Sequence, residues 1–457
     1  MTLAEQYALF VSKLDWTRLP TEVKQIALEL FSDWFANAVA GFESPLGQAL
    51  RSLSPVVYDG TGRAMRVGDL VLTEPLWAAL MNASAAHALE FDDSYRAGLY
   101  HPGAQILSAA FSAACKAEIP GSTFLAAMVA GYEVSLRLAS AVNPSHYKLW
   151  HTTGTVGPFG AAAAAGYALG LDPKKIAAAF GIAGTQAAGL WEILPDAPQV
   201  KSLHPAKAAF AGLLAALLAQ KGIEGPLTIL EGAQGFFAAT VPEPVSLKKC
   251  TAGLGKEWLT LDTTFKAYPV CGHAMTPIEA SLKLHGQFDL EMVEEVEVRA
   301  HPVSLQVASQ PYPVDEYQAK FSIPYCVAAA LFRGRVGQEE FSSQLRRCQK
   351  IQGLLKKIRL IPDDGLAKVP GQRTARICVR LVGGKTLVAL AEVRKGDPEY
   401  PMTADEKFDK FLKLIGKAWG ERVAENVFES IGMLPQAESV LKWAEELRVL
   451  VERQPNT

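Results

Sequence analysis

The chain has 457 residues, of which 49% are hydrophobic and 20% are charged, and its formal net charge is -2. These values describe a globular protein with a large buried fraction, long enough for about two domains. The near-neutral charge and the lack of a basic tract argue against nucleic acid as a partner.

The sequence also argues against export, membrane insertion and metal binding. Residues 1–14 include Glu5 and Lys13 and lack the contiguous apolar core of a signal peptide. The longest apolar run, within residues 206–220, contains Lys207 and is too short for a membrane span. The six cysteines have no close pair, which favours free thiols over disulfides or a zinc site. We therefore expect a soluble, cytoplasmic protein that works without a metal or cofactor.

Helices are predicted throughout the first half of the chain. Residues 21–41 repeat apolar side chains every three or four positions, with Thr21 as the expected N-cap. Segments 121–141, 157–169 and 174–189 are rich in Ala and Gly, so they should pack closely on all sides. Residues 1–264 are expected to form an all-helical domain, and its apolar helices favour a homo-oligomer.

One stretch of this half, HALEFDDSYRAGLYHPGA at residues 87–104, concentrates polar side chains between two apolar helical runs. It contains Glu90, Asp92, Asp93, Ser94 and His101. A spacing of three places Glu90 and Asp93 on one helical face, with Asp92 pointing elsewhere. Glycine and proline then break the helix, so we expect His101 on a loop that can approach the carboxylates. The alternative is a helix end with solvated acids.

The composition changes after residue 264. Residues 292–301 alternate apolar and charged side chains as a half-exposed strand does, and 376–382 and 385–393 flank the hairpin signal Gly383-Gly384. Helices are predicted at 277–286, 323–334 and 341–357, and again at 403–416, 421–431 and 437–452. We expect residues 265–399 to form a smaller α+β lid domain, inserted into a helical domain that includes residues 400–457. A ligand is expected to bind in the cleft between them.

Further ionisable side chains lie among apolar neighbours. His151 precedes an Ala/Gly-rich helix, whose N-terminus would keep it neutral or help it bind an anion. The others are Lys201, His204 and Lys207 around one helix start, Lys266, Cys271 and His273 at the domain boundary, and Tyr325 after the expected N-cap Ser322. Each has a structural alternative, such as a capping histidine or a solvated lysine. Together, lysines and imidazoles suit a small substrate with several carboxylates, and acids and histidines suit proton transfer at carbon.

These segments resemble the MmgE/PrpD family, which includes 2-methylcitrate dehydratase, cis-aconitate decarboxylase and iminodisuccinate epimerase. The similar blocks include HALEFDDSY with HPGA, HTTGTVGPFG, KSLHPAKAAF, FKAYPVCGHA, AKFSIPYCVAAA and RKGDPEYPMT, and they extend over essentially the whole chain. The resemblance implies a mainly α fold, in which a large all-helical domain from both chain ends carries an inserted α+β lid. It also implies a homodimer without a cofactor.

The resemblance further implies a set of site residues. The catalytic positions are Glu90, His101, His151, Lys201, Lys266 and Tyr325, and we expect Asp93, Ser94, His204, Lys207 and His273 to bind the substrate. Glu90 and Ser94 stand where the decarboxylase branch has Asp and Thr, and the loop before His101 is one residue longer.

Our first hypothesis for the function is a lyase that dehydrates a 2-methylcitrate-like hydroxy acid. Lysines would neutralise the substrate carboxylates, and His101 or His151 would move the proton. Epimerisation of an iminodisuccinate-like amino-dicarboxylate and decarboxylation of cis-aconitate are alternatives within the enzyme class. A carboxylate-binding dimer without activity is the alternative from another class.

Overall fold

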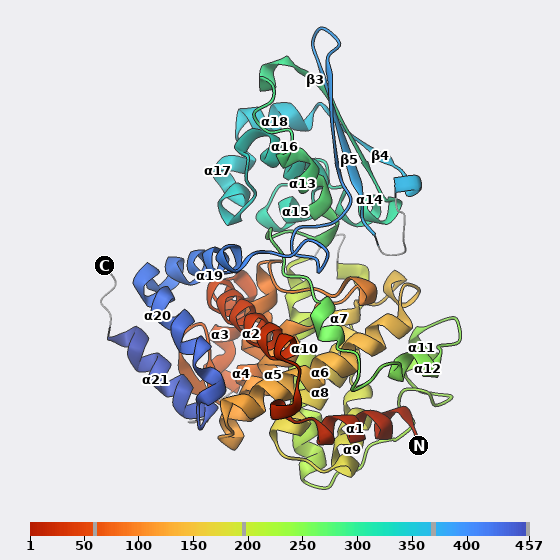
Figure 1. Cartoon of the computed structure of the whole chain (residues 1–457), viewed down its shortest axis with the longest axis vertical. Coiled ribbons are helices and arrows are strands. Elements are labelled where there is room, and N and C mark those ends of the chain that lie inside the picture. Colours follow the sequence, from red (N-terminus) through yellow and green to blue (C-terminus); the bar gives the residue numbers. More distant parts are fainter. Residues whose placement is uncertain (58–61, 194–197, 367–371, 454–457) are drawn as a thin grey trace. The chain divides into compact units, whose positions relative to one another are not determined.

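The computed structural model describes residues 1–57, 62–193, 198–366 and 372–453, and most of them are helical, as the sequence predicts (Figure 1). The chain divides into two compact units, one formed by residues 1–265 and 403–457 and the other by residues 266–402. Both ends of the chain therefore belong to the first unit.

The first unit is built from helices and one short hairpin. Its helices before the second unit are α1 (Leu3–Lys13), α2 (Thr21–Gly41), α3 (Pro45–Val57), α4 (Pro75–Ala88), α5 (Gly103–Ala117), α6 (Gly121–Val142), α7 (Thr152–Thr155), α8 (Gly157–Ala168), α9 (Pro173–Gly184), α10 (Leu203–Gln220), α11 (Phe236–Thr240) and α12 (Leu247–Thr251). After the second unit come α19 (Ala404–Trp419), α20 (Glu421–Gly432) and α21 (Val440–Glu452). The hairpin pairs β1 (Ala64–Arg66) with β2 (Val71–Thr73).

Small side chains let the central helices pack closely. In α8, every residue except Tyr167 is buried. A Cβ atom at Gly160 would lie 2.8 Å from the Cβ of Ser135 on α6, so the approach of α6 and α8 requires glycine there. Two segments, Gly121–Val142 and Gln199–Gln220, are long and apolar enough to cross a membrane. However, 89% and 61% of their apolar windows are buried inside the protein, as in core helices.

The second unit is an α+β fold around a four-stranded sheet. Its elements are α13 (Met275–Leu282), β3 (Val293–Ala300), α14 (Pro302–Ala308), α15 (Glu316–Lys320), α16 (Ile323–Arg333), α17 (Ser343–Arg346), α18 (Gln349–Leu355), β4 (Ile358–Pro362), β5 (Ala375–Leu381) and β6 (Thr386–Ala391). The strand order is β4-β3-β5-β6, with only the β3 and β4 pair parallel. Alternate residues of β3, such as Val296 and Val298, are buried, which is the period-two pattern of the prediction.

Several predicted elements differ from the structure. Thr21 is the first residue of α2, and Pro20 is the N-cap without a side-chain hydrogen bond. The helix predicted at 341–357 is divided into α17 and α18, because the first helix ends at Arg346, with Arg347 as its C-cap, and Cys348 is the N-cap of the second. The helix predicted at 174–189 ends at Gly184, with Thr185 as its C-cap.

Candidate functional site

The stretch at residues 87–104 connects the end of α4 to the start of α5. Helix α4 ends at Ala88, and Glu90 then takes a left-handed backbone conformation with a φ of +55°. The predicted shared helical face of Glu90 and Asp93 is therefore wrong, because neither residue is helical. Backbone hydrogen bonds in both directions between Ser94 and Thr264 fix the middle of this connection.

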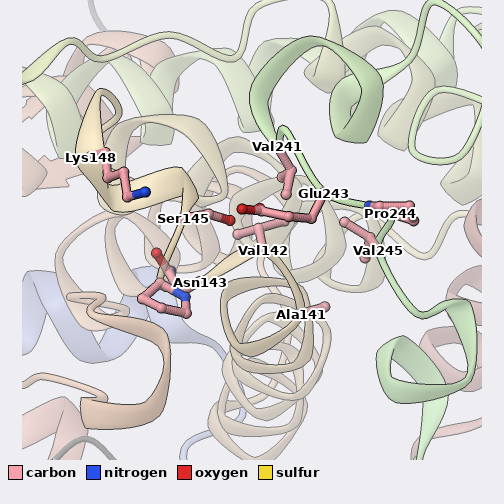
Figure 2. Close-up of a pocket in the computed structure, with 10 residues that line it drawn as sticks. Ala141, Val142, Asn143, Ser145, Lys148, Val241, Glu243, Pro244 and Val245 are labelled. Atoms are coloured by element: carbon pink, nitrogen blue, oxygen red, sulfur yellow. The ribbon is translucent and has the colours of Figure 1, made fainter.

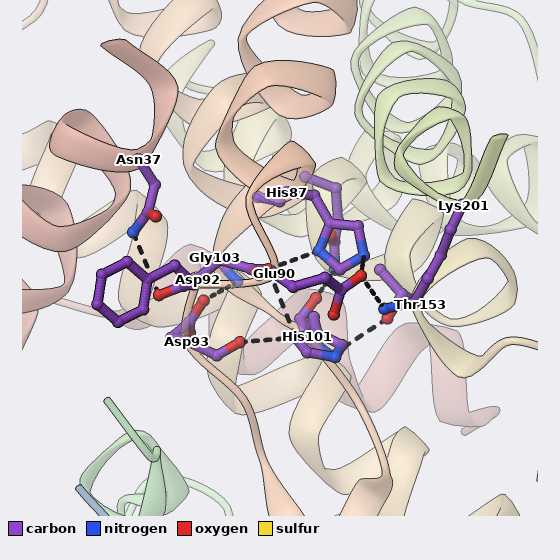
Figure 3. Close-up of polar contacts among 12 residues, drawn as sticks. Asn37, His87, Glu90, Asp92, Asp93, His101, Gly103, Thr153 and Lys201 are labelled. Carbon is purple, nitrogen blue, oxygen red and sulfur yellow. Dashed lines mark hydrogen bonds and ion pairs between the residues drawn. The ribbon is translucent and has the colours of Figure 1, made fainter. Parts of the chain in front are cut away.

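Asp92 lies between two imidazole rings (Figure 3). Its Oδ2 atom is 2.7 Å from Nδ1 of His87 and 3.4 Å from Nδ1 of His101. Burial alone would raise the pKa of the Asp92 carboxyl, but the two imidazoles outweigh burial and hold that pKa well below its usual value. We expected Asp92 to point away from the other acids. It is instead an ionised carboxylate between the two imidazoles.

Glu90 forms a buried ion pair with Lys201, although 111 residues separate them in the chain. Nζ of Lys201 lies 2.5 Å from Oε1 of Glu90, and both side chains are at most 4% exposed. The same carboxylate oxygen is 3.8 Å from Nε2 of His87. The loop carboxylates therefore neutralise a lysine and support imidazoles, as Figure 3 shows.

Asp93 has its own, separate set of partners. Its carboxylate accepts hydrogen bonds from the Tyr132 hydroxyl at 2.9 Å and from the backbone N–H of Gly103 at 3.0 Å. Burial, together with the charges of Asp92 and Asp33, raises the pKa of the Asp93 carboxyl well above its usual value. Asp93 therefore links the start of α5 to α6, and each of its carboxylate oxygens accepts a hydrogen bond from the protein.

Two further histidines meet beside this cluster. The Nδ1 atoms of His151 and His204 are 2.9 Å apart, so one ring donates and the other accepts. Burial, with help from Lys201 and the neighbouring imidazoles, lowers the pKa of His151 well below its usual value. Burial and Lys207 lower the pKa of His204 to about 4. Both rings are therefore neutral near pH 7, and their Nε2 atoms are one hydrogen-bond donor and one acceptor, which add no charge.

Predictions for helix starts in this region are partly confirmed. His151 precedes the Ala/Gly-rich α8, as expected, but it is the N-cap of the unpredicted short helix α7. His204 is the second residue of α10. Lys201 belongs to a short 3-10 helix, Pro198–Ser202. Lys207 donates hydrogen bonds to the carbonyl oxygens of Gln186 and Ala188, so it satisfies the backbone that follows α9.

The remaining predicted residues belong to the second unit. Lys266 is completely buried at its start, and Nδ1 of His273 lies 3.1 Å from Oγ of Ser304. The Tyr325 hydroxyl donates to the carbonyl oxygen of Glu340 at 2.5 Å, and Ser322 caps α16 as predicted. The structure thus brings together Glu90, His101, His151, Lys201 and His204 in the first unit, and places Lys266, His273 and Tyr325 in the second.

Several buried polar atoms of the first unit make no hydrogen bond with any described residue, among them Ser84 Oγ and Gln105 Oε1. Two of them belong to the stretch at residues 87–104 that carries the acids: the hydroxyl oxygen of Ser94 and Nε2 of His87. Buried polar atoms are nearly always satisfied in folded proteins, so such atoms are common where a ligand or ordered water binds. Nε2 of His87 lies 3.8 Å from the Glu90 carboxylate that pairs with Lys201, which supports a polar ligand site in this unit.

His87, Asp92 and Trp191 were missed as site residues. His87 lies in the last turn of an Ala-rich helix, so its sequence position looks like a core position. The one sequence feature that could have marked it as a site residue is the acid three residues later. The Trp191 ring centroid is 4.4 Å from that of His151, and the tryptophan carries no sequence motif that marks this contact.

Three side chains are spaced as possible metal ligands. The ligand atoms of His87, Asp92 and His101 all lie within 4.8 Å of one another. However, the 2.7 Å between Nδ1 of His87 and Oδ2 of Asp92 is a hydrogen-bond length. Two ligands bound to one zinc ion are about 3.3 Å apart, given bonds of about 2.0 Å in tetrahedral geometry. The arrangement therefore corresponds to two imidazoles that share a carboxylate.

A surface pocket lies at the C-terminal end of α6 (Figure 2). Its polar lining comes from Asn143, Ser145, Lys148 and Glu243. None of the ten residues that line it is a predicted site residue, and a single lysine faces a glutamate there. A pocket of this kind does not favour a polyanionic ligand, so the buried cluster of the first unit is the stronger candidate site.

Comparison with protein families matches both parts of the chain. The MmgE/PrpD N-terminal domain matches residues 5–247, and the MmgE/PrpD C-terminal domain matches residues 268–431.

Individual relatives are similar over most of their length. A cis-aconitate decarboxylase-like protein, oryM, from Aspergillus oryzae is 28% identical over 449 residues, which cover 92% of each chain. Cis-aconitate decarboxylase from Homo sapiens is 28% identical over 453 residues, covering 96% of this chain and 92% of its own. A 2-methylcitrate dehydratase from Cupriavidus necator is 23% identical over 315 residues, covering 65% of this chain and 64% of its own.

Proposed function

The chain belongs to the MmgE/PrpD family, and on that premise we propose that it is a lyase acting on a small di- or tricarboxylic acid. The observation that carries the proposal is the buried cluster of Lys201, the Asp92-supported His101 and the neutral His151–His204 pair, with the unsatisfied Nε2 of His87 beside the carboxylate that pairs with Lys201. A cation, a proton carrier and neutral donors are the groups that such a reaction requires.

We propose that Lys201 binds a carboxylate of the substrate. In the structure its ammonium group is neutralised by Glu90, in an environment where an ion pair is weakly screened. A substrate carboxylate would share this ammonium group or replace Glu90, and the Ser94 hydroxyl and His87 Nε2 would receive hydrogen-bond partners. The neutral histidine pair adds one donor and one acceptor without adding a further charge.

His101 is the proposed group that moves the proton. Its Nδ1 atom is held by Asp92 and by the carbonyl oxygen of Asp93 at 3.0 Å, so exchange with a substrate would run through Nε2. In a dehydration, His101 takes a proton from the carbon next to a carboxylate, and the hydroxyl group leaves as water with a proton supplied by solvent. In a decarboxylation, His101 is first protonated by solvent, the bond to a carboxylate breaks, carbon dioxide leaves, and the imidazolium donates its proton to the carbanion. Asp92 stabilises the imidazolium in both cases.

Two reactions remain as candidates for this lyase. Dehydration of a 2-methylcitrate-like acid is the first hypothesis from the sequence. The full-length similarity to cis-aconitate decarboxylases gives decarboxylation at least equal support, because the dehydratase relative covers only 65% of this chain. We also propose that Lys266 and Tyr325 of the second unit take part in substrate binding, as the family resemblance implies.

The test is a panel of citrate, 2-methylcitrate, cis-aconitate and iminodisuccinate, with products identified by NMR. A dehydratase forms an unsaturated acid with the same number of carbons, whereas a decarboxylase forms an acid with one carbon fewer. Turnover of one polycarboxylate that is lost in Lys201→Met supports the proposal. No turnover of any acid, with binding retained, would favour the carboxylate-binding dimer.

A further inference from the structure

The C-terminal helix α19 contacts the acidic loop through one buried lysine. Nζ of Lys410 lies 2.7 Å from the carbonyl oxygen of Phe91, the residue between Glu90 and Asp92. The Lys410 side chain is only 6% exposed, and its ammonium group sits 3.9 Å from the centroid of the Phe91 ring. An ammonium group over an aromatic face is attracted by the ring electrons, so Lys410 holds both the peptide and the ring of Phe91.

The charge of Lys410 is balanced by helix α2. Its Nζ atom is 2.6 Å from Oδ1 of Asp33, whose side chain is 8% exposed. Asn37, one turn later on α2, donates its amide N–H to the same Phe91 carbonyl at 3.4 Å and to the Asp33 carbonyl at 2.8 Å. Figure 3 shows the Asn37 side chain directed at this part of the loop. One carbonyl of the loop is therefore held by donors from α2 and α19.

The loop needs such support because its backbone is strained next to the catalytic groups. Glu90 has a φ of +55°, a left-handed conformation that is unfavourable for a residue with a Cβ atom. The Phe91 carbonyl belongs to the peptide that leads into Asp92. A change of this peptide plane would move the Glu90 carboxylate away from Lys201 or the Asp92 carboxylate away from the two imidazoles.

We propose that Lys410 is a positioning residue for the reaction, because it fixes the Phe91 peptide and so orients the Glu90 and Asp92 carboxylates on either side of it. This role rests on the proposed function only in assigning catalysis to Glu90 and Asp92. It adds to the active site a residue from the C-terminal segment.

The competing explanation is that Lys410 merely offsets the buried charge of Asp33. A set of variants separates the two. Lys410→Met removes the ammonium donor to Phe91 and leaves the Asp33 carboxylate without its cation. The double variant Lys410→Met/Asp33→Asn also removes the unpaired charge, and Asp33→Asn alone keeps the donor. Lys410→Gln retains an N–H donor and serves if the double variant does not fold. Lys413→Met is the matched control, because Lys413 lies on the same helix but pairs only at the surface with Asp409.

The measurements are the thermal midpoint, kcat and KM on the acid that the wild-type enzyme turns over, and the exchange of imidazole N–H protons in 15N-histidine-labelled protein. The double variant should recover most of the stability lost by Lys410→Met. Its kcat should stay at least about tenfold below that of wild type, because catalytic groups are misplaced, and its KM should stay within about threefold of the wild-type KM. The protected N–H signal of the His87–Asp92 hydrogen bond should exchange faster in it. Three variants should keep a kcat within about threefold of the wild-type value: Asp33→Asn, Lys410→Gln and Lys413→Met. A change this small is less than the loss of a positioned group would cause.

Wild-type kcat and a protected imidazole signal in the double variant would overturn the proposal, as would an equal loss of kcat in Asp33→Asn. If the wild-type protein turned over no acid, the proposed function would fail, but the exchange measurement would still decide whether Lys410 positions the loop.

Discussion

Nζ of Lys201 lies 2.5 Å from Oε1 of Glu90, and both side chains are buried. Removing one partner of such a pair leaves a buried charge without compensation, which commonly costs about 3–5 kcal/mol. Lys201 is therefore expected to affect both the stability of the first unit and substrate binding. Single and double variants separate these two effects.

Lys201→Met should lower the thermal midpoint and abolish turnover, because it leaves Glu90 unpaired and removes the proposed carboxylate ligand. Lys201→Met/Glu90→Gln should regain most of the lost stability, but no activity. Differential scanning fluorimetry and a turnover assay measure both quantities. Recovery of activity in the double variant would contradict a role for Lys201 in binding the substrate.

His101→Asn should reduce kcat by about 10²–10⁴-fold with little change in the thermal midpoint, because it removes the proton carrier from a partly exposed position. Asp92→Asn should also lower kcat, since it removes the charge that stabilises the imidazolium. His301→Asn is the matched control: His301 caps α14, and asparagine is a good N-cap, so activity and stability should both be kept. An active His101→Asn enzyme would exclude His101 as the proton carrier.

Stability should fall as the pH is lowered from about 6.5 to about 4, in part because of His204. Burial and Lys207 lower the pKa of His204 to about 4, whereas an unfolded histidine titrates near about 6.5. In this range the unfolded chain binds a proton that the folded chain does not, so acid favours unfolding. The thermal midpoint of His204→Gln should therefore change less between pH 6.5 and 4.5 than that of wild type.

His146→Gln should have the same effect, because burial also lowers the pKa of His146 to about 4. Parallel pH profiles for wild type and both variants would show that these imidazoles are not buried in their neutral form.

Gly103→Ala should destabilise the protein and impair turnover. A Cβ atom there would lie 2.4 Å from Oδ1 of Asp93 and 2.8 Å from the Tyr132 hydroxyl, so the hydrogen bonds that start α5 would have to open. The control is Gly166→Ala inside α8, where the nearest atom to a new Cβ is 3.4 Å away. This control should stabilise the helix by about 0.5–1 kcal/mol. Equal midpoints for both variants would contradict the packing at Gly103.

Long periodic segments were predicted well, and short elements were not. The period of α2 and the alternation of β3 extend over enough residues to identify each element. Strands of three residues, such as β1 and β2, are too short to show alternation. The edge strand β4 depends on its parallel pairing with β3, a contact between segments about 60 residues apart that no local pattern reveals.

The candidate site was predictable in its residue types but not in its connections. Acids, histidines and lysines among apolar neighbours indicated the right stretches. The orientation of Asp92 depended on where α4 ends, and the left-handed conformation of Glu90 has no signal in its side chain. The partners of Glu90 and Phe91, Lys201 and Lys410, come from distant parts of the chain, so only the folded structure brings them together.

The central claim is that His101 transfers a proton at a carbon of the substrate, and deuterium incorporation tests it most directly. Each acid of the panel is incubated with enzyme in heavy water, and deuterium at the carbon next to a carboxylate is measured in the product of a decarboxylation or in the hydroxy acid recovered from a reversible dehydration. We expect one acid to gain a single deuterium with the wild-type enzyme and with His301→Asn, and none with His101→Asn. Deuterium incorporation that is unchanged in His101→Asn, or its absence for every acid with the wild-type enzyme, would contradict the account.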